Sequence, residues 1–133
     1  MISEVSPLVT IALATFNEED FVSESIESIL NQSYENFELI VVDDCSSDNT
    51  LEIIKRYSSD ERVSLYKNEN NSGLAFTRNR SLELANGDFI IFVDGDDILS
   101  EMLVEKSVSA AIKNGSDLVM WDYEVFSNSN DIN

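Results

Sequence analysis

The stretch IIFVDGDDIL, residues 90 to 99, joins an apolar run of strand-forming residues to the carboxylates of Asp94, Asp96 and Asp97. Such a run is typical of a buried strand that presents polar groups at its end. Asp94 and Asp96 alternate around Gly95, so two hard oxygen ligands can approach one cation, and the absent side chain leaves room for a ligand against the backbone. The stretch therefore predicts a metal site at a strand end.

The available ligand types favour Mg2+ or Mn2+ at this site. The chain has no His and a single Cys, Cys45, which disfavours zinc, whereas carboxylates and water suit Mg, Ca and Mn. An EF-hand calcium loop would need a Glu after a longer run of alternating oxygen ligands, but Ile98 and Leu99 follow Asp97. We therefore expect Mg2+ or Mn2+ as the cofactor.

Outward from this stretch, apolar runs alternate with amphipathic ones along the chain. Strands are expected at residues 8–15, 37–44, 62–66, 89–93 and 117–123. The intervening helices are expected to begin after Asn17, after Ser47 or Asp48, at Gly73 and at Ser100. This order predicts an α/β fold, a mostly parallel sheet with helices on both faces.

Local signals refine these helices. Glu18, Glu19 and Asp20 are expected in a first turn capped by Asn17, on a helix with Phe21, Val22, Ile26, Ile29 and Leu30 on its apolar face. Asn86 and Gly87 are expected to end the third helix through a positive φ. Gly115 is expected to end the fourth helix, whose inward face is expected to include Ile112.

Composition limits the classes of partner. The chain has 26 acidic and 8 basic residues, for a formal net charge of -18, which repels nucleic acid and anionic membranes. Its 133 residues with 43% apolar content predict one domain over residues 1–126, with residues 127–133 as a polar tail or linker. No stretch approaches a membrane span, the start does not look like a signal peptide, and Cys45 has no partner, so a cytoplasmic location is expected.

Ligands of open α/β sheets bind outside the carboxyl ends of the strands. Three strand ends carry polar or aromatic groups here: Thr15, Phe16 and Asn17; Asp43 and Asp44; Asp94, Asp96 and Asp97. Phe16 could pack on a nucleobase while Asp44 accepts from a ring N–H. A diphosphate could then extend to a cation on Asp96, with help from Arg78 and Arg80.

Each of these residues has a plainer interpretation when taken singly. Asp44, Asp48 and Asp97 precede helices, where carboxylates serve as caps without any ligand. Phe16 alone is more typical of a core residue, and Arg78 of a solvated helix position or an ion pair. The case for a site depends on their combination.

Several segments in this order, TFNEE, SILNQS, FELIVVDDCSSDNT, NNSGLAFTRNRSLELANGDFIIFVDGDD and SDLVMWDYEVF, closely resemble glycosyltransferase family 2, the inverting GT-A type. The similarity covers about residues 8 to 126. It implies a Rossmann-like GT-A nucleotide-diphospho-sugar transferase fold, a divalent metal and an activated donor, above all a UDP-sugar.

The resemblance also implies roles for individual residues. Asp44 matches the carboxylate that reads the base, with Thr15, Phe16 and Asn17 beside it. Asp94, Gly95 and Asp96 match the DxD motif that touches ribose and metal, with Asp96 as the metal ligand. Gly73, Arg78 and Asn79 match the G…RN segment that lines the donor pocket, and Asp43 is expected to support the loop.

The family activity implied is hexosyl transfer, with inversion, to the hydroxyl of a glycan or lipid-linked acceptor in cell-surface polysaccharide synthesis. The family's general base lies downstream and is expected beyond Asn133. The chain is therefore expected to be either part of a longer enzyme, acting in the cytoplasm or at the inner face of the membrane, or a nucleotide-sugar-binding fragment that transfers nothing by itself.

Two other classes share the acidic strand end. In haloacid-dehalogenase phosphatases the first carboxylate of a DxD is a nucleophile, but that motif normally ends the first strand and here it ends the fourth. A response regulator would need a Lys after the last strand, which this chain lacks. Both are disfavoured.

Overall fold

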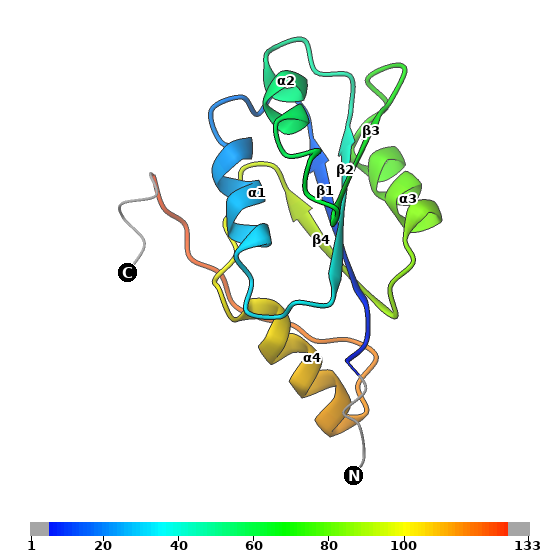
Figure 1. Cartoon of the computed structure of the whole chain (residues 1–133), viewed down its shortest axis with the longest axis vertical. Coiled ribbons are helices and arrows are strands. Elements are labelled where there is room, and N and C mark those ends of the chain that lie inside the picture. The colour runs from blue at the N-terminus through cyan, green and yellow to red at the C-terminus, as the bar shows by residue number, and fades with distance from the viewer. Residues whose placement is uncertain (1–5, 128–133) are drawn as a thin grey trace.

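The computed structural model describes residues 6–127 and shows an α/β fold, as the alternation of runs predicted (Figure 1). The elements are β1 (Val9–Thr15), α1 (Val22–Leu30), β2 (Phe37–Asp43), α2 (Thr50–Lys55), β3 (Val63–Lys67), α3 (Leu74–Leu84), β4 (Phe89–Asp94) and α4 (Leu103–Asn114). The strands form one sheet in the order β3-β2-β1-β4, and every pairing is parallel. All carboxyl ends of the strands therefore meet at one edge.

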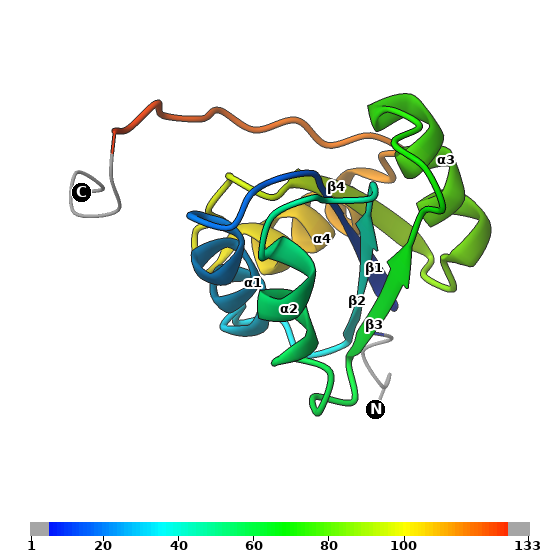
Figure 2. The ribbon, with the colours of Figure 1, turned by 90° about the horizontal axis from the view of Figure 1, so that it is seen from above.

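The main core lies on one face of the sheet. Leu13 of β1 pairs with Val41 of β2 and Val93 of β4, so these side chains share that face. Helices α1 and α4 cover it with Ile26, Ile29, Val104 and Val108, which belong to the same buried apolar cluster. Strands β1 and β2 are buried along almost their whole length, because α1, α2 and α4 lie on this face of the sheet and α3 lies on the other (Figure 2).

Helix α3 covers the other face through small side chains. Its buried residues are Thr77 and Ser81, and it packs against β1 and β2. Ala12 and Ala14 of β1 alternate with the core residues and so face α3. No helix within residues 6–127 has the length and apolar character needed to cross a bilayer.

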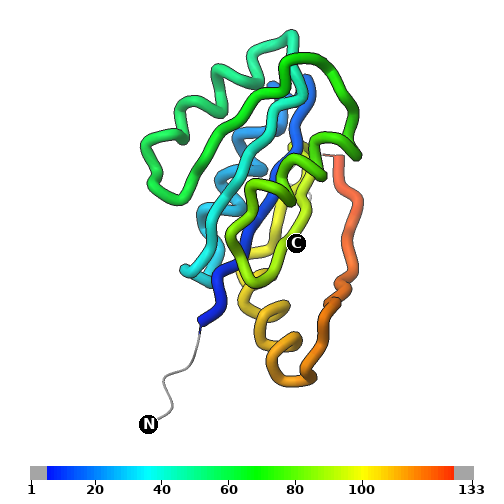
Figure 3. The backbone as a smooth tube through the Cα atoms, turned by 90° about the vertical axis from the view of Figure 1, so that its right-hand side faces the viewer, coloured from blue at the N-terminus to red at the C-terminus, as the bar shows by residue number. Residues whose placement is uncertain are grey.

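The predicted strand at residues 117–123 is wrong. This segment is extended but has no strand assignment, and no backbone hydrogen bond joins it to β4 within the described residues. Figure 3 shows it as a separate run beyond β4. Leu118 is 77% exposed and Val125 is 90% exposed, so the segment has the composition of a strand without a partner for its backbone groups. Among the strands of residues 6–127, β4 is consequently an open edge of the sheet.

Two predicted helix starts are also displaced, and a third is confirmed. Asn17 does not cap α1, because it has a positive φ of 50° and the helix begins at Val22 after a turn closed on the carbonyl of Glu18. Asp48 does bind the first N–H of α2, that of Thr50, at 2.9 Å. Helix α4 begins at Leu103, three residues after Ser100.

Two residues lie on a different side of their helices from the one predicted. Phe21 and Ile112 were expected on the inner faces of their helices, but both are exposed. Phe21 precedes α1, and Ile112 lies on the outer side of the last turn of α4. Gly115 does end α4 in the left-handed conformation, with φ of 60°, as predicted.

The end of α3 depends on close contact rather than on a positive φ. Neither Asn86 nor Gly87 has a positive φ, which corrects the prediction. A Cβ on Gly87 would lie 2.5 Å from the backbone nitrogen of Thr10 and 2.7 Å from the carbonyl oxygen of Phe89. Gly87 is therefore required because the chain passes directly over β1 at this point.

Replacing Asp60 with asparagine should reduce stability in a pH-dependent way. Side-chain hydrogen bonds from Arg62, at 3.0 and 2.8 Å, lower the pKa of Asp60 to about 2. An unfolded aspartate has a pKa of about 4, so the stabilisation is present above that pH and is lost as the pH falls toward 2. Because the pair is partly exposed, we expect the variant to lose about 1 kcal/mol at pH 7.

Urea unfolding measured between pH 7 and pH 2 checks this expectation. The difference between the protein and Asp60→Asn should shrink as the pH falls through the lower part of that range. Glu61→Gln, at the exposed neighbouring position, is the matched control and should change little. A difference that stays constant down to pH 2 would contradict the assignment.

Candidate donor site

The candidate site begins where β1 and β2 end side by side. Thr15 and Asp43 are paired in the sheet, and the hydroxyl of Thr15 donates to Oδ1 of Asp43 at 3.1 Å. Oδ2 of Asp43 accepts from the backbone nitrogen of Ser46 at 2.9 Å. Asp43 therefore supports the loop after β2, as expected, and is fully buried while doing so.

The loop after β1 presents Phe16 and holds Asn17. The amide oxygen of Asn17 accepts from the backbone nitrogen of Ser47 at 2.8 Å, and the backbone nitrogen of Asn17 donates to the hydroxyl of Ser46 at 2.9 Å. Asn17 thus joins the two loops. Phe16 is 41% exposed, so its ring is not a core residue and retains a free surface beside these loops.

Asp44 lies at the centre of a set of donors. Oδ1 accepts from Nδ2 of Asn68 and from the backbone nitrogen of Ser72, both at 2.8 Å, and Oδ2 accepts from the backbone nitrogen of Gly73 at 2.9 Å. Gly73 has a φ of 90° and immediately precedes α3. Only 5% of Asp44 is exposed.

These donors explain the ionisation of Asp44. Burial of the carboxyl opposes its ionisation, but the hydrogen bonds from Ser72, Asn68 and Gly73 hold the pKa of Asp44 below its ordinary value. An ionised carboxylate can only accept hydrogen bonds. Asn68 was not among the residues expected at the site, although it follows the carboxyl end of β3 and so satisfies the same strand-end rule.

Arg78 connects α3 to the acidic turn. Its Nη2 donates to Oδ1 of Asp94 at 3.1 Å, and its guanidinium carbon lies 5.7 Å from the centre of the Phe92 ring. Arg80 instead binds the carbonyl of Lys67 and the amide oxygen of Asn68, so it does not join Arg78 at the predicted diphosphate site. Asn79 is exposed on α3, turned about 100° from Arg78 around the helix.

The turn after β4 is closely packed at its glycine. Gly95 is buried, and a Cβ there would lie 3.0 Å from Cγ2 of Thr15 and 3.1 Å from Cγ of Glu18. The expectation that this glycine leaves space for a ligand is therefore wrong, because protein side chains fill that space. Asp96 and Asp97 are the exposed carboxylates of the turn.

Glu18 joins this acidic group, and no sequence pattern indicated it. Burial first, and then the negative charges of Asp96 and Asp94, raise the pKa of Glu18 above its ordinary value. Burial and the same two aspartates likewise raise the pKa of Asp97. The turn is thus a place where a cation would relieve repulsion between carboxylates.

The donor chemistry of the turn suits Mg2+ or Mn2+ provided that other oxygens complete the shell. Within residues 6–127 no three acidic or Cys side chains converge so as to hold a metal unaided. Mg2+ is commonly bound by one or two carboxylates together with substrate phosphates. Asp94, held by Arg78, and the exposed Asp96 fit that mode.

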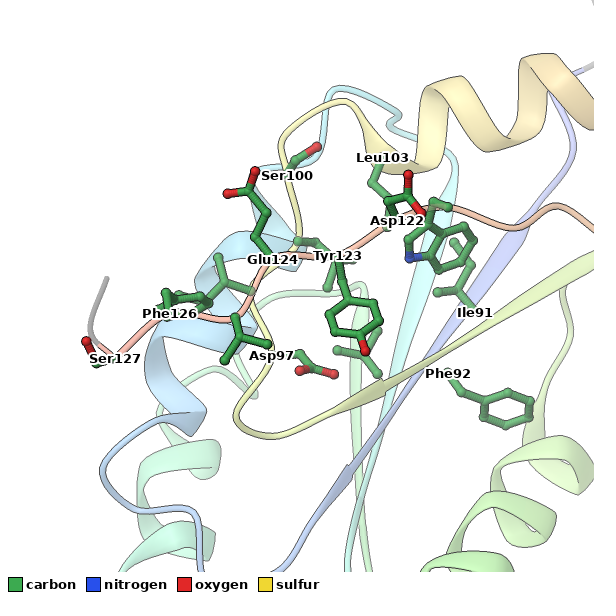
Figure 4. Close-up of a pocket in the computed structure, with 15 residues that line it drawn as sticks. Ile91, Phe92, Asp97, Ser100, Leu103, Asp122, Tyr123, Glu124, Phe126 and Ser127 are labelled. Atoms are coloured by element: carbon green, nitrogen blue, oxygen red, sulfur yellow. The ribbon is translucent and has the colours of Figure 1, made fainter. Parts of the chain in front are cut away.

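A cavity of about 890 Å3 opens on the outer side of the turn, between β4 and residues 121–127. Asp97 lines it, and Figure 4 shows the ring of Tyr123 reaching from the C-terminal segment toward β4. The ring of Phe92 lies across β4, toward α3. None of the residues that line the cavity belongs to the loops that hold Asp44.

Two curated relatives resemble most of the chain. It is 41% identical over 122 residues to an Escherichia coli protein named UDP-Glc:alpha-D-GlcNAc-diphosphoundecaprenol beta-1,3-glucosyltransferase WfgD. The aligned residues cover 92% of this chain and 48% of that protein. It is 34% identical over 120 residues to the glycosyltransferase GlyG of Streptococcus pneumoniae, covering 90% of this chain and 40% of that protein. The chain therefore spans less than half of the length of either relative.

Solved structures share both the fold and part of the sequence. S. aureus TarS 1-349 in complex with UDP-GlcNAc superposes with a TM-score of 0.78 at 32% identity, over 82% of this chain and 32% of that one. The mannosyltransferase PcManGT from Pyrobaculum calidifontis, in complex with GDP-Man and Mn2+, gives a TM-score of 0.71 at 25% identity, over 83% and 32%. The model of the family described as Glycosyl transferase family 2 matches residues 10–132, so this chain belongs to glycosyltransferase family 2.

Proposed function

We propose that this chain is the donor-binding part of an inverting glycosyltransferase that takes a nucleotide-diphospho-sugar, with UDP-sugars as the first candidates. The observation that carries the proposal is the placement of two carboxylates by one short segment. The backbone nitrogen of Gly73 binds Asp44, and Arg78, five residues later on α3, binds Asp94. A ligand that extends between these carboxylates would meet a base-reading group at one end and a phosphate-facing group at the other.

The base would lie between Phe16 and Asp44. Phe16 offers a partly exposed ring, and aromatic side chains stack on nucleobases. The ionised carboxylate of Asp44 accepts hydrogen bonds only, so it favours a base with a ring N–H, such as uracil or guanine. The complexes of TarS with UDP-GlcNAc and of PcManGT with GDP-Man support this choice of ligand class.

The diphosphate would lie over the acidic turn. Asp96 and Asp94 would hold Mg2+ or Mn2+, and the bound cation would offset the negative charge of the diphosphate as it leaves. The guanidinium of Arg78 stands beside Asp94 and can also bind a phosphate oxygen. PcManGT, whose complex contains Mn2+, supports a divalent metal.

The acceptor would approach from the outer side of the turn, where Asp97 lines the cavity of about 890 Å3. A hydroxyl that attacks there would reach the sugar carbon from the face opposite the diphosphate, which accounts for inversion. We place the general base outside these 133 residues, since the matched residues make up less than half of the relatives that are named as glycosyltransferases. A glycan or lipid-linked acceptor, as in the name of WfgD, is the first class to test.

Calorimetric titration of UDP, GDP and CDP tests this proposal. With Mn2+ present we expect UDP or GDP to bind, CDP to bind on the order of ten-fold more weakly because its ring nitrogen lacks the hydrogen, and chelator to weaken every nucleotide. Folded protein that binds none of the three with Mn2+ would overturn the proposal. Equal affinity for all three nucleotides would contradict the proposed role of Asp44 in recognising the base.

The same samples distinguish an enzyme from a binding fragment. Release of sugar from UDP-glucose or UDP-GlcNAc in the presence of Mn2+ would show that these 133 residues catalyse by themselves. Saturable binding without release would support the narrower function, in which the chain binds the donor and depends on further sequence for transfer. Both outcomes are consistent with the donor site, and they differ only in whether the general base lies within these 133 residues.

A further inference from the structure

Asn68 is an unusual member of the interior. It is only 2% exposed and lies directly after β3, where its backbone nitrogen donates to the carbonyl of Asp43 at 2.8 Å. Among the largest side chains that the described residues bury completely, it is the polar one. Buried amides are costly unless their hydrogen bonds are made, so its partners indicate what it does.

Every polar atom of the Asn68 side chain has a partner. Nδ2 donates to Oδ1 of Asp44 at 2.8 Å and to the hydroxyl of Thr77 at 3.0 Å, while Oδ1 accepts from Nη1 of Arg80 at 2.8 Å. The partners dictate the orientation of the amide, because a carboxylate only accepts and a guanidinium only donates. An aspartate at this position could not donate to Asp44, and a leucine could bind none of the three partners.

We propose that Asn68 is the positioning residue for Asp44 in donor binding, and that it acts by fixing the carboxylate relative to the start of α3. The inference rests on the proposed function, in which Asp44 meets the nucleobase. Asn68 itself is buried behind Asp44 and does not touch the donor. Its effect is to decide which oxygen of Asp44 remains available.

The hydrogen bonds divide the two oxygens of Asp44 unequally. Oδ1 accepts from both Asn68 and the backbone nitrogen of Ser72, whereas Oδ2 accepts from the backbone nitrogen of Gly73. Each carboxylate oxygen has about two acceptor positions, so Oδ2 retains one for a ligand. Without Asn68 the carboxylate can rotate or draw the loop toward itself, and that position is no longer held.

Asn68 also ties this carboxylate to the helix that holds the other. The hydroxyl of Thr77, which accepts from Asn68, donates to the carbonyl of Gly73 at 2.8 Å. Arg78 follows Thr77 on α3 and binds Asp94. Asn68 and the first turn of α3 therefore form a chain of contacts that fixes the position of Asp44 relative to Asp94.

Asn68→Leu, which removes the donors but keeps a similar volume, tests the proposal. We expect it to weaken UDP or GDP binding with Mn2+ by roughly 10- to 100-fold, and CDP binding by no more than a few-fold, so the preference between the bases collapses. A merely structural role would weaken all three nucleotides alike. Asn70→Leu makes the same substitution at an exposed position of the same loop and should leave the preference unchanged.

Amide hydrogen exchange at Ser72 and Gly73, measured without nucleotide, gives a readout independent of the donor. These amides should exchange faster in Asn68→Leu than in the parent and in Asn70→Leu, while amides of β1 keep their protection. If Asn68→Leu does not fold, Thr77→Val, which removes one partner of Asn68, should show a smaller change in the same direction.

The two proposals fail in different ways. Unchanged exchange at Ser72 and Gly73, or an unchanged ratio of UDP to CDP affinity, would overturn the role of Asn68 even if nucleotides bind. Failure of the parent protein to bind any of the nucleotides would overturn the proposed function, while the exchange rates would still decide whether Asn68 holds the loop around Asp44.

Discussion

Asp96→Asn is expected to weaken Mn2+-supported UDP binding on the order of 100-fold. Asp96 is an exposed carboxylate of the acidic turn, and Asp94 beside it is already paired with Arg78. Replacing it with an amide keeps the shape of the side chain and removes the negative charge that a divalent cation needs. Calorimetry with UDP and Mn2+ measures the loss directly.

The comparison with chelator separates a metal ligand from a residue that touches the nucleotide. With chelator present, the parent and Asp96→Asn should bind UDP with the same weak affinity, because the mutation and the removal of metal abolish the same interaction. A loss that persists in chelator would contradict the assignment. Asp117→Asn, at an exposed position on the C-terminal segment, is the control and should behave as the parent.

Leu13→Ala should lower the free energy of unfolding by about 3 to 5 kcal/mol. Leu13 is 0% exposed and lies on β1, between β2 and β4, where its side chain belongs to the main core. Its removal leaves a cavity that the paired strands on either side cannot close. Urea unfolding at neutral pH measures the loss.

Leu118→Ala is the matched control, because it removes the same atoms from a side chain that is 77% exposed. We expect it to change the free energy of unfolding by less than about 0.5 kcal/mol. A loss below about 1 kcal/mol in Leu13→Ala would mean that the centre of the sheet can rearrange, and would contradict the packing described here.

The sheet could be predicted from the sequence because burial on both faces leaves long apolar runs. β1 and β2 carry such runs, and their observed bounds differ from the predicted ones by one residue at an end. Residues 117–123 have the same composition, but a strand also needs a neighbour for its backbone groups. Composition reports burial and propensity, and it does not report whether a partner strand is present.

Helix starts were less predictable because a polar side chain can bind either the nearby helix end or a distant loop. Asn17 has the right type for a cap, yet its amide oxygen binds the backbone of Ser47 in the neighbouring loop. That partner is 30 residues away in the sequence, so local patterns cannot reveal it. Asp48 binds Thr50, only two residues away, and its capping role was recognised.

The site was predicted as far as the strand ends identify it. Asp44 and Asp94 directly follow or end apolar strands, and the structure brings both to the same edge of the sheet. Glu18 escaped notice because its proximity to Asp96 arises from packing against Gly95. Asn68 was not predicted because β3 is short and half-buried. Its sequence therefore lacks the long apolar run that identified the ends of the other strands.

The open edge of β4 has a consequence for behaviour in solution. Unpaired edge strands tend to join other strands, and beside this edge the chain exposes several apolar side chains, Leu118, Met120, Tyr123 and Val125. The net charge of -18 keeps separate copies apart in dilute buffer. Salt at about 1 M reduces the range of that repulsion to roughly 3 Å and leaves backbone hydrogen bonding between strands intact. We therefore expect separate copies to associate through this edge more readily at high ionic strength.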